Sequence, residues 1–523
     1  MTAKPSIRPL NRYTDISELS GKVRNAIKRI SLPLAVALAA ECLYLVFTGR
    51  PGAEAFGLIG IGTMIALSIW TTRAIGLPLL PVMVFQGLII YGTPIAAGHE
   101  IIMSYPPSYV TAAGFEVMVF NIVLALAWSA GMRMFQPASP VSYVLQEFNR
   151  EGIKGWARLG FALVIGATAF EVLEGLNLAD GLLALLPGGA GSIIYALVSV
   201  VSACGFFLVS MMIAGKRATV LERIAFWGLL IANGMISAQD FILASATANL
   251  ITVAVGFFWS NGRVPWRYLV ITMMTLSFLN MGKVTMRERH WGPDNEPVGQ
   301  FPLVQLPACY SEWINVSFDA LIENNVGAHP GSGATANAGN KNQTLLDRID
   351  NLQNLLFVID AINSDHVSLL HGQTYSLIPP LLVPRVFWPD KPRSHEGQVL
   401  LNVHFGRQDL NSTFATYIAW GLLPEAYGNF GTVMGSVVLG LFLGIAFAWI
   451  ENYTSRKLVM STEGFLSLSL LMNILNSFEM VASVLVTATF QSFMIVIVAC
   501  APFVRRTVIK PTVHDDGGKN VTG

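Results

Sequence analysis

The feature that most constrains the fold of this chain is a series of apolar runs long enough, or nearly long enough, to cross a membrane. About 20 apolar residues in a helix cross the roughly 30 Å hydrocarbon core of a bilayer. On that length criterion the sequence predicts about twelve spans. They lie near residues 31–48, 55–72, 75–97, 109–132, 159–176, 190–213, 224–238, 241–260, 267–282, 431–450, 463–478 and 480–503. We therefore expect an all-α, polytopic membrane helix bundle.

Composition agrees with a membrane protein and argues against a nucleic-acid partner. Hydrophobic residues make up 53% of the 523 residues and charged residues only 12%, and the mean hydropathy is +0.55. A soluble globular domain is more highly charged. The formal net charge of +1 gives no basis for binding nucleic acid. The four cysteines form neither a CxxC pair nor a disulfide framework.

The distribution of Lys and Arg predicts the orientation of the chain. If the basic N-terminal tail lies in the cytoplasm, the loops predicted to lie inside are rich in Lys and Arg, and the short outer loops are nearly bare, with Arg50 as the main exception. The inside loops contain Arg73, Arg133, Arg150, Lys154, Arg158, Lys216, Arg217, Arg223, Arg263, Arg267, Arg456, Lys457, Arg505, Arg506 and Lys510. We therefore expect both termini to be cytoplasmic.

This topology divides the chain into five segments, of which the third is unusually long. They are a basic cytoplasmic tail (1–30), an N-terminal transmembrane bundle (31–282), a large external loop between the ninth and tenth spans (283–430), the C-terminal transmembrane helices (431–503) and a cytoplasmic tail (504–523). A connection as long as 283–430 is typically functional.

The external loop combines a small-residue linker, a predicted helix and a proline-rich apolar segment. Small residues at 328–344 predict a linker. Apolar residues at helical spacing over 345–363 predict an amphipathic helix that packs on the membrane domain or lies at its outer surface. LIPPLLVP, at 377–384, is too short and too rich in proline to span, which indicates a re-entrant or interfacial segment.

Cations follow directly after this proline-rich segment. Arg385 together with Lys391 or Arg393 suits the binding of a pyrophosphate at the bilayer surface, since Arg offers a fork to phosphate oxygens and Lys a point charge. The alternative from the residues alone is that these cations are ordinary snorkelling anchors of a loop.

A resemblance to a known family favours pyrophosphate binding over anchoring as the role of these cations. HGQTYSLIPPLLVPRVFWPDKP, at 371–392, and GLLPEAYGNFG, at 421–431, resemble the bacterial oligosaccharide repeat-unit polymerases, the Wzy-type O-antigen polymerases. The resemblance in residues covers roughly 371–431, and the many spans with a long external loop extend it loosely over the chain. It includes none of the residues of the first nine spans.

The resemblance implies a glycosyltransferase of the bacterial inner membrane that polymerises polyprenyl-pyrophosphate-linked repeat units for O-antigen, capsule or exopolysaccharide. Such an enzyme needs a base, stabilisation of the departing pyrophosphate, and a groove for glycans. The residues expected to bind pyrophosphate or substrate are Arg385, Lys391, Arg393, Arg348 and Tyr375. The candidate bases are His371, Asp390, His395 and Glu425.

Carboxylates inside the predicted spans require an explanation, because burying a charge in a bilayer is costly. Glu41, Glu116, Glu171 and Glu174 face either a polar cavity for a glycan or carrier, or hydrogen-bonding partners on neighbouring helices. We expect Glu479, at an outer loop tip, to be solvated.

We expect neither a metal nor another cofactor, because no Gly-rich phosphate loop, HExxH or nucleophile elbow occurs. The expected partners are the membrane, a lipid-linked oligosaccharide substrate, a chain-length regulator and a flippase. Two other functions stay open. One is an O-antigen ligase or related lipid-linked sugar transferase, and the other is a flippase.

Overall fold

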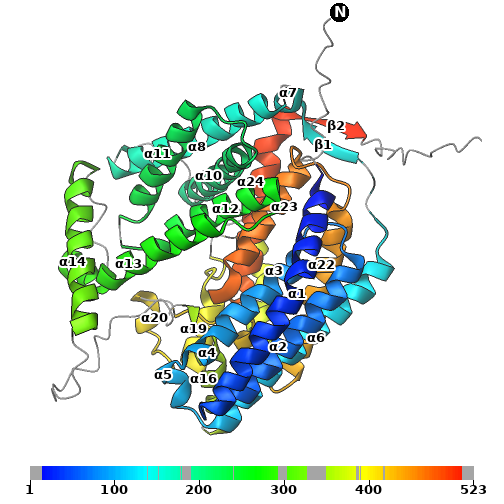
Figure 1. Ribbon diagram of the computed structural model, residues 1–523, viewed down its shortest axis with the longest axis vertical. Helices are drawn as coiled ribbons and strands as arrows, with labels where there is room; N and C mark the ends of the chain where they lie inside the picture. Colours follow the sequence, from blue (N-terminus) through cyan, green and yellow to red (C-terminus); the bar gives the residue numbers. More distant parts are fainter. Residues whose placement is uncertain are drawn as a thin grey trace, which may run out of the picture.

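The computed structural model describes most of the chain. The described residues are 15–137, 139, 141–150, 152–176, 178–179, 190–239, 241–291, 303–326, 349–364, 366–383, 388, 390–415 and 418–508. They form a helical bundle with one small sheet (Figure 1). Within these described residues, ten helical segments are long and apolar enough to cross a membrane. The structure thus confirms the predicted all-α, polytopic membrane fold.

The helices of the first half follow the predicted spans closely. They are α1 (Ile16–Phe47), α2 (Ala53–Arg73), α3 (Leu79–Gly87) continuing through a π-helical turn η2 (Leu88–Gly92) into α4 (Thr93–Ala97), α5 (Glu100–Met103), α6 (Pro107–Met134), α7 (Gln146–Arg150), α8 (Ile153–Gly175), α10 (Ala190–Ala214), α11 (Val220–Ser237), α12 (Leu243–Asn261) and α13 (Trp266–His290). Helix α1 begins inside the predicted tail, because Asp15 caps its N-terminus by accepting a hydrogen bond from the Ser17 N–H at 2.9 Å.

The remaining elements form the external loop and the C-terminal helices. They are a 3-10 turn η3 (Leu303–Gln305), α14 (Leu306–Val326), α16 (Leu352–Asn363), α17 (Gln373–Ser376), α18 (Ile378–Leu382), α19 (Glu396–His404), α20 (Ser412–Ala415), α21 (Leu422–Phe430), α22 (Met434–Thr454), α23 (Thr462–Leu475), η4 (Ser477–Glu479), α24 (Ala482–Cys500) and η5 (Ala501–Phe503). Helices α12 and α23 match predicted spans but are not among the ten.

Helices α2, α6 and α22 pack closely side by side (Figure 1). A Cβ at Gly114 of α6 would lie 2.5 Å from the Cα of Ala55 in α2, and one at Gly444 of α22 would lie 2.5 Å from the carbonyl oxygen of Leu124 in α6. Such contacts are sterically forbidden, so these two positions require glycine. Small residues allow the backbones to approach, which is how helices associate in lipid.

A second group of helices contains α8, α10, α11 and α12, with α13 and α14 at its edge (Figure 1). Its core includes the buried residues Phe206, Phe226 and Val253. Helix α14 is fixed on α13 through a hydrogen bond from Trp313 Nε1 to the carbonyl oxygen of Leu279 at 2.8 Å. This group supplies the membrane side of the site described below.

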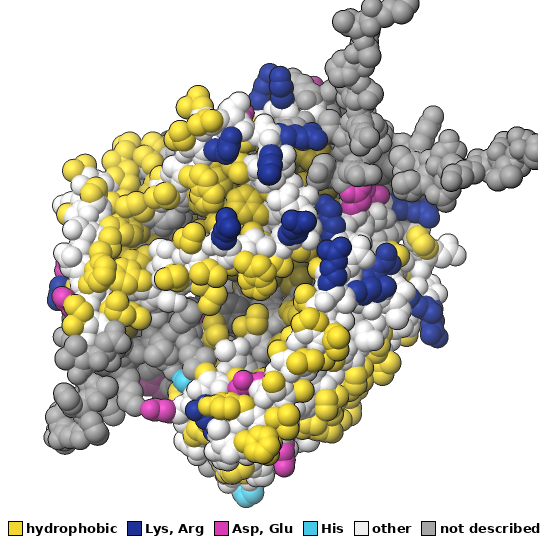
Figure 2. Space-filling view, in the orientation of Figure 1, with side chains coloured by type: hydrophobic (Ala, Val, Ile, Leu, Met, Phe, Trp, Pro, Cys, Tyr) yellow, Lys and Arg dark blue, Asp and Glu magenta, His cyan; other side chains and the backbone are white. Residues whose placement is uncertain are grey.

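Segments predicted to be cytoplasmic meet at one end of the molecule (Figure 1). Strand β1 (Val141–Leu145) pairs antiparallel with β2 (Val504–Val508), and Asp15 forms a bridge with Leu458. Figure 2 shows Lys and Arg side chains gathered toward this end. Elements of the predicted external loop, including α16 and α19, lie at the opposite end. The described ends of the chain therefore lie on the same side.

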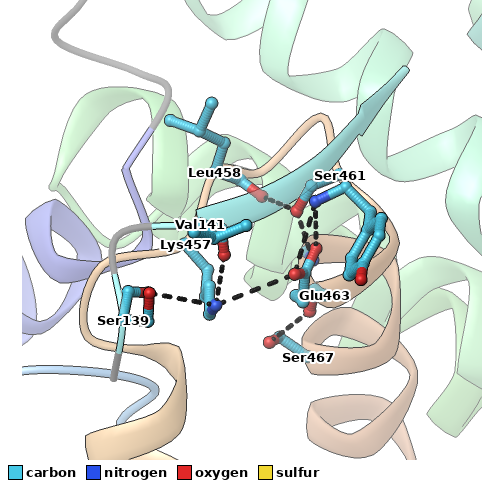
Figure 3. Close-up of polar contacts among 9 residues, drawn as sticks. Ser139, Val141, Lys457, Leu458, Ser461, Glu463 and Ser467 are labelled. Carbon is cyan, nitrogen blue, oxygen red and sulfur yellow. Dashed lines mark hydrogen bonds and ion pairs between the residues drawn. The ribbon is translucent and has the colours of Figure 1, made fainter. Parts of the chain in front are cut away.

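An ion pair holds the sheet against the start of α23 (Figure 3). Lys457 Nζ lies 3.8 Å from a Glu463 carboxylate oxygen, and both side chains are buried. The same ammonium donates to the carbonyl oxygens of Val141 and Ser139 at 2.5 and 3.3 Å. Glu463 in turn accepts a hydrogen bond from the Tyr143 N–H at 3.1 Å. This cluster joins the α22–α23 turn to β1.

The external loop is more helical than its sequence suggests. The expected helix at 345–363 is described from Ile349, and α16 buries an apolar face that includes Leu355, Leu356 and Ile359 against neighbouring helices. Helix α14 was not predicted. Residues 328–344, the predicted linker, lie outside the described residues.

Candidate functional site

A cavity of about 860 Å³ lies between the second helix group and the external loop. Its membrane side consists of residues from α8, α10, α11, α12 and α13, and its outer side of Ile349, His395, Gln398, Ala419 and residues around η4. Its polar and aromatic lining residues are Phe170, Glu171, Glu174, Tyr195, Ser199, Ser202, Ser237, Gln239, Thr247, Asn249, Asn280, His395, Gln398, Asn476 and Glu479. A volume of this size suits a ligand of several rings.

A chain of amides fixes one carboxylate on the membrane side of the cavity. Asn249 Nδ2 donates to Asn233 Oδ1 at 2.6 Å, and Asn233 Nδ2 donates to Glu171 Oε2 at 2.6 Å. Asn233 is fully buried. Because its oxygen already accepts from Asn249, its NH₂ must point to Glu171. Both explanations offered for Glu171 from the sequence therefore hold: it lines a cavity and bonds to a neighbouring helix.

His395 is the one candidate base that lines the cavity. Its Nδ1 lies 2.8 Å from Gln398 Oε1, on the first turn of α19. In the tautomer in which Nδ1 donates to this amide oxygen, Nε2 carries the lone pair of the imidazole. This tautomer is the one that a proton acceptor at Nε2 requires.

Glu479 also lines the cavity, which the sequence did not suggest. Its backbone carbonyl accepts a hydrogen bond from the Trp420 N–H at 3.3 Å, which joins η4 to the external loop. The side chain is exposed, as the sequence predicts, and the residue also belongs to the wall of the site.

Lys391 and Arg393 are both engaged within the loop. Lys391 Nζ donates to the carbonyl oxygens of Leu381 and Val383, each at 2.7 Å, and so satisfies the C-terminal end of α18. Arg393 Nε lies 3.5 Å from a Glu396 carboxylate oxygen, and both side chains are partly exposed. The proline-rich segment is thus a short helix tied down by the lysine that follows it.

Glu425 is fully buried below the external loop and does not line the cavity. Its Oε2 accepts a hydrogen bond from the Ala482 N–H at 2.6 Å, at the start of α24. Burial raises the pKa of Glu425 to about 7, against the lowering effect of the hydrogen bonds from Ala482 and Thr374. The carboxyl group joins α21 to α24.

The other predicted residues are spread over the loop. Tyr375 stacks on Phe430 with ring centroids 5.6 Å apart, and burial raises the pKa of its phenol well above the usual value. His371 and Asp390 are exposed. Arg348 and Arg385 lie outside the described residues. Of the expected bases, the structure therefore brings only His395 to the cavity.

Arg407, in the α19–α20 connection, is a cation that the sequence did not single out. Its Nη1 donates to Asn354 Oδ1 at 2.5 Å, and its guanidinium carbon lies 5.3 Å from the ring centre of Phe357 and 5.8 Å from that of Trp420. Burial lowers the pKa of Arg407. Asn354 also donates to the carbonyl oxygen of Ala419, a cavity residue, at 3.1 Å. Nothing in the spacing of FGRQDL indicated this position.

Two further carboxylates, Glu116 and Glu451, accept hydrogen bonds from neighbouring segments of the helix bundle. Glu116 of α6 accepts hydrogen bonds from the Val433 N–H and the Ser436 hydroxyl at the start of α22. Glu451 of α22 accepts from two indoles and two backbone N–H groups. Neither lines the cavity.

No group of three His, Cys, Asp or Glu side chains arranged for a metal ion occurs in the described part of the chain. No protein family, curated protein or solved structure matches the chain. The chemistry that the site itself offers is a set of amides, hydroxyls, carboxylates and aromatic rings around a positioned imidazole, which suits a hydroxyl-rich ligand.

Proposed function

We propose that this multi-pass membrane protein polymerises lipid-linked oligosaccharide repeat units at the outer face of the bacterial cytoplasmic membrane. The observation that carries the proposal is the 860 Å³ cavity, whose apolar wall carries interspersed polar groups, and which has membrane helices on one side and, on the other, His395, just after the polymerase-like segment 371–392. A lipid-linked glycan needs such a site, because its carrier stays in the bilayer while its sugars need polar partners.

The reaction is the displacement of a pyrophosphate by a sugar hydroxyl. The acceptor oxygen forms a bond to the anomeric carbon of the donor chain, and the bond from that carbon to the pyrophosphate oxygen breaks with its electron pair. Polyprenyl pyrophosphate leaves, and the proton of the acceptor hydroxyl passes to a base. A positioned base and cations at the leaving group lower the barrier to this step.

His395 is our proposed base, because it is the candidate base that lines the cavity and Gln398 fixes the orientation of its ring. For the pyrophosphate, Arg385 remains the first choice from the sequence. Arg407 joins it from the structure. Its half-buried guanidinium donates to one amide oxygen and lies over two aromatic rings, so it retains N–H donors for an anion.

The proposal includes a topology with both termini in the cytoplasm and 283–430 outside. A cysteine introduced at position 335 should react with an impermeant thiol reagent added to the outside of spheroplasts. Reaction only after the membrane is opened would reverse the topology and remove the site from the outer face.

The decisive test is the surface glycan ladder of cells in which the native gene is replaced by a variant, with equal membrane expression. Arg385→Ala and His395→Ala should remove long chains while single repeats still reach the surface. His404→Ala is the matched control, because it lies on the last turn of α19 and does not line the cavity. Unchanged ladders would refute the proposal, and loss of even the single repeats would favour a ligase or a flippase.

A further inference from the structure

We propose that the part of the cavity bounded by α8, α10, α11 and α12 is an acceptor-sugar subsite that takes neutral or amino-bearing glycans and excludes sugar acids and phosphates. This inference rests on the proposed function and specifies the substrate class of the same site. It starts from Glu171 and Glu174, one helical turn apart on α8, which both line the cavity.

The first line of argument is the acceptor capacity of these two carboxylates. Glu171 accepts hydrogen bonds from Asn233, at 2.6 Å, and from the Ser237 hydroxyl, and no ion pair reaches Glu171 or Glu174 in the described part of the chain. An ionised carboxylate has about four lone-pair sites. The pair therefore retains acceptors for O–H or N–H donors of a ligand in the cavity.

A second, independent observation comes from two other residues that line the cavity. Ser202 Oγ and Gln239 Oε1 are buried without a hydrogen-bond partner, and both residues line the cavity. Ser202 is 2% exposed and Gln239 5%. Buried polar atoms without partners are rare because each costs free energy. Their presence around one cavity indicates that a polar ligand completes their hydrogen bonding.

Charge then decides which glycans fit. Among the described lining residues, carboxylates occur and Lys and Arg do not. An anionic group next to Glu171 and Glu174 would be repelled when these carboxylates are ionised, whereas hydroxyl and ammonium groups donate to them. Phe170 and Tyr195 add flat apolar faces to the same wall. The carrier pyrophosphate must therefore bind elsewhere, on the cations of the loop.

The test measures the charge selectivity of the cavity and does not need the native substrate. Ser199→Cys places a thiol on the α10 wall, and Ser376→Cys is an exposed control outside the cavity. In purified full-length protein, each thiol reacts with a trimethylammonium-ethyl and with a sulfonato-ethyl methanethiosulfonate. The unsubstituted chain supplies the background rate of its four native cysteines.

We expect the ratio of cationic to anionic reaction rates at position 199 to exceed that at position 376 by roughly tenfold at low ionic strength. Adding Glu171→Gln and Glu174→Gln to Ser199→Cys should bring the ratio to within about twofold of the control. Equal ratios at the two positions, or a ratio that the double substitution leaves unchanged, would overturn the inference.

The glycan ladder of the Glu171→Gln/Glu174→Gln protein separates this inference from the proposed function. Shortened chains support a subsite for the acceptor. An unchanged ladder beside a charge-selective cavity overturns the subsite, while the His395→Ala ladder still tests polymerisation. If both variants leave the ladder unchanged, the proposed function itself fails.

Discussion

Glu451→Gln should destabilise the bundle strongly, because this one carboxylate joins three helices. Its Oε2 accepts from the indoles of Trp70 and Trp128 at 3.1 and 2.9 Å, and its Oε1 from the N–H groups of Ile75 and Gly76 at 2.9 and 3.4 Å. Glu451 is 1% exposed. Glutamine keeps one acceptor oxygen and turns the other into a donor, so two of these N–H groups lose their acceptor.

Each buried donor left without a partner costs about 1–3 kcal/mol, so the loss in unfolding free energy should be about 2–6 kcal/mol. The measurement is the fraction of monodisperse protein left after heating in detergent, followed by size-exclusion chromatography. Glu41→Gln is the control, since Glu41 lies in α1 with no polar contact to the described residues. Equal melting midpoints for the two variants would show that the carboxylate does not hold these helices together.

Three further predictions concern the loop and the predicted cytoplasmic end. Burial raises the pKa of Glu425 from 4.5 to about 7, so the folded state binds the carboxyl proton more tightly than the unfolded state does. The protonated carboxyl group therefore contributes its full stabilisation to the folded state below about pH 4.5, and about 3 kcal/mol of unfolding free energy is lost by pH 7. Glu425→Gln should flatten the fall in melting midpoint between pH 5 and 8, and an unchanged slope would contradict this assignment. Lys391→Met removes two hydrogen bonds to carbonyl oxygens at the end of α18 and should cost about 1–3 kcal/mol of local stability. Proteinase K should therefore cleave the loop faster in this variant. Equal cleavage rates would refute the capping role. In a double-mutant cycle, Lys457→Met and Glu463→Gln should show a coupling of about 1–3 kcal/mol in thermal stability, and additive effects would show that the buried pair is not coupled.

The fold class followed from the sequence because long apolar runs allow few structures in a membrane. Each of the twelve predicted runs overlaps a helix in the structure. The pairing of β1 with β2 was not predictable in the same way, since it joins segments far apart in the chain. Helix α14 was missed because it has apolar residues on two faces: Trp313 is buried against α13, whereas Ile314 and Phe318 are exposed. A single apolar stripe, the usual signal, is absent from this segment.

The candidate site was only partly predictable, because the sequence reveals residue types but not which surface they face. The cost of an intramembrane charge correctly drew attention to Glu171 and Glu174. The same reasoning cannot place Glu479, which the sequence puts at a loop tip and the fold puts on the cavity wall. His395 and Glu425 were equal candidates for the base until their positions separated them.

Position relative to the cavity distinguishes Glu171 and Glu174 from the carboxylates that hold helices of the bundle together. Glu451 accepts four hydrogen bonds, and Glu116 accepts two from the start of α22. The hydrogen bonds that these two carboxylates accept hold neighbouring helices together. Glu171 accepts hydrogen bonds from Asn233 and Ser237, Glu174 accepts none from the described residues, and these two line the large cavity. Both side chains are half-buried, and their remaining acceptor capacity is available to water or to a ligand. A glycan that displaces this water must supply hydroxyl or amino groups in its place, which is why the charge of the sugar should decide its entry.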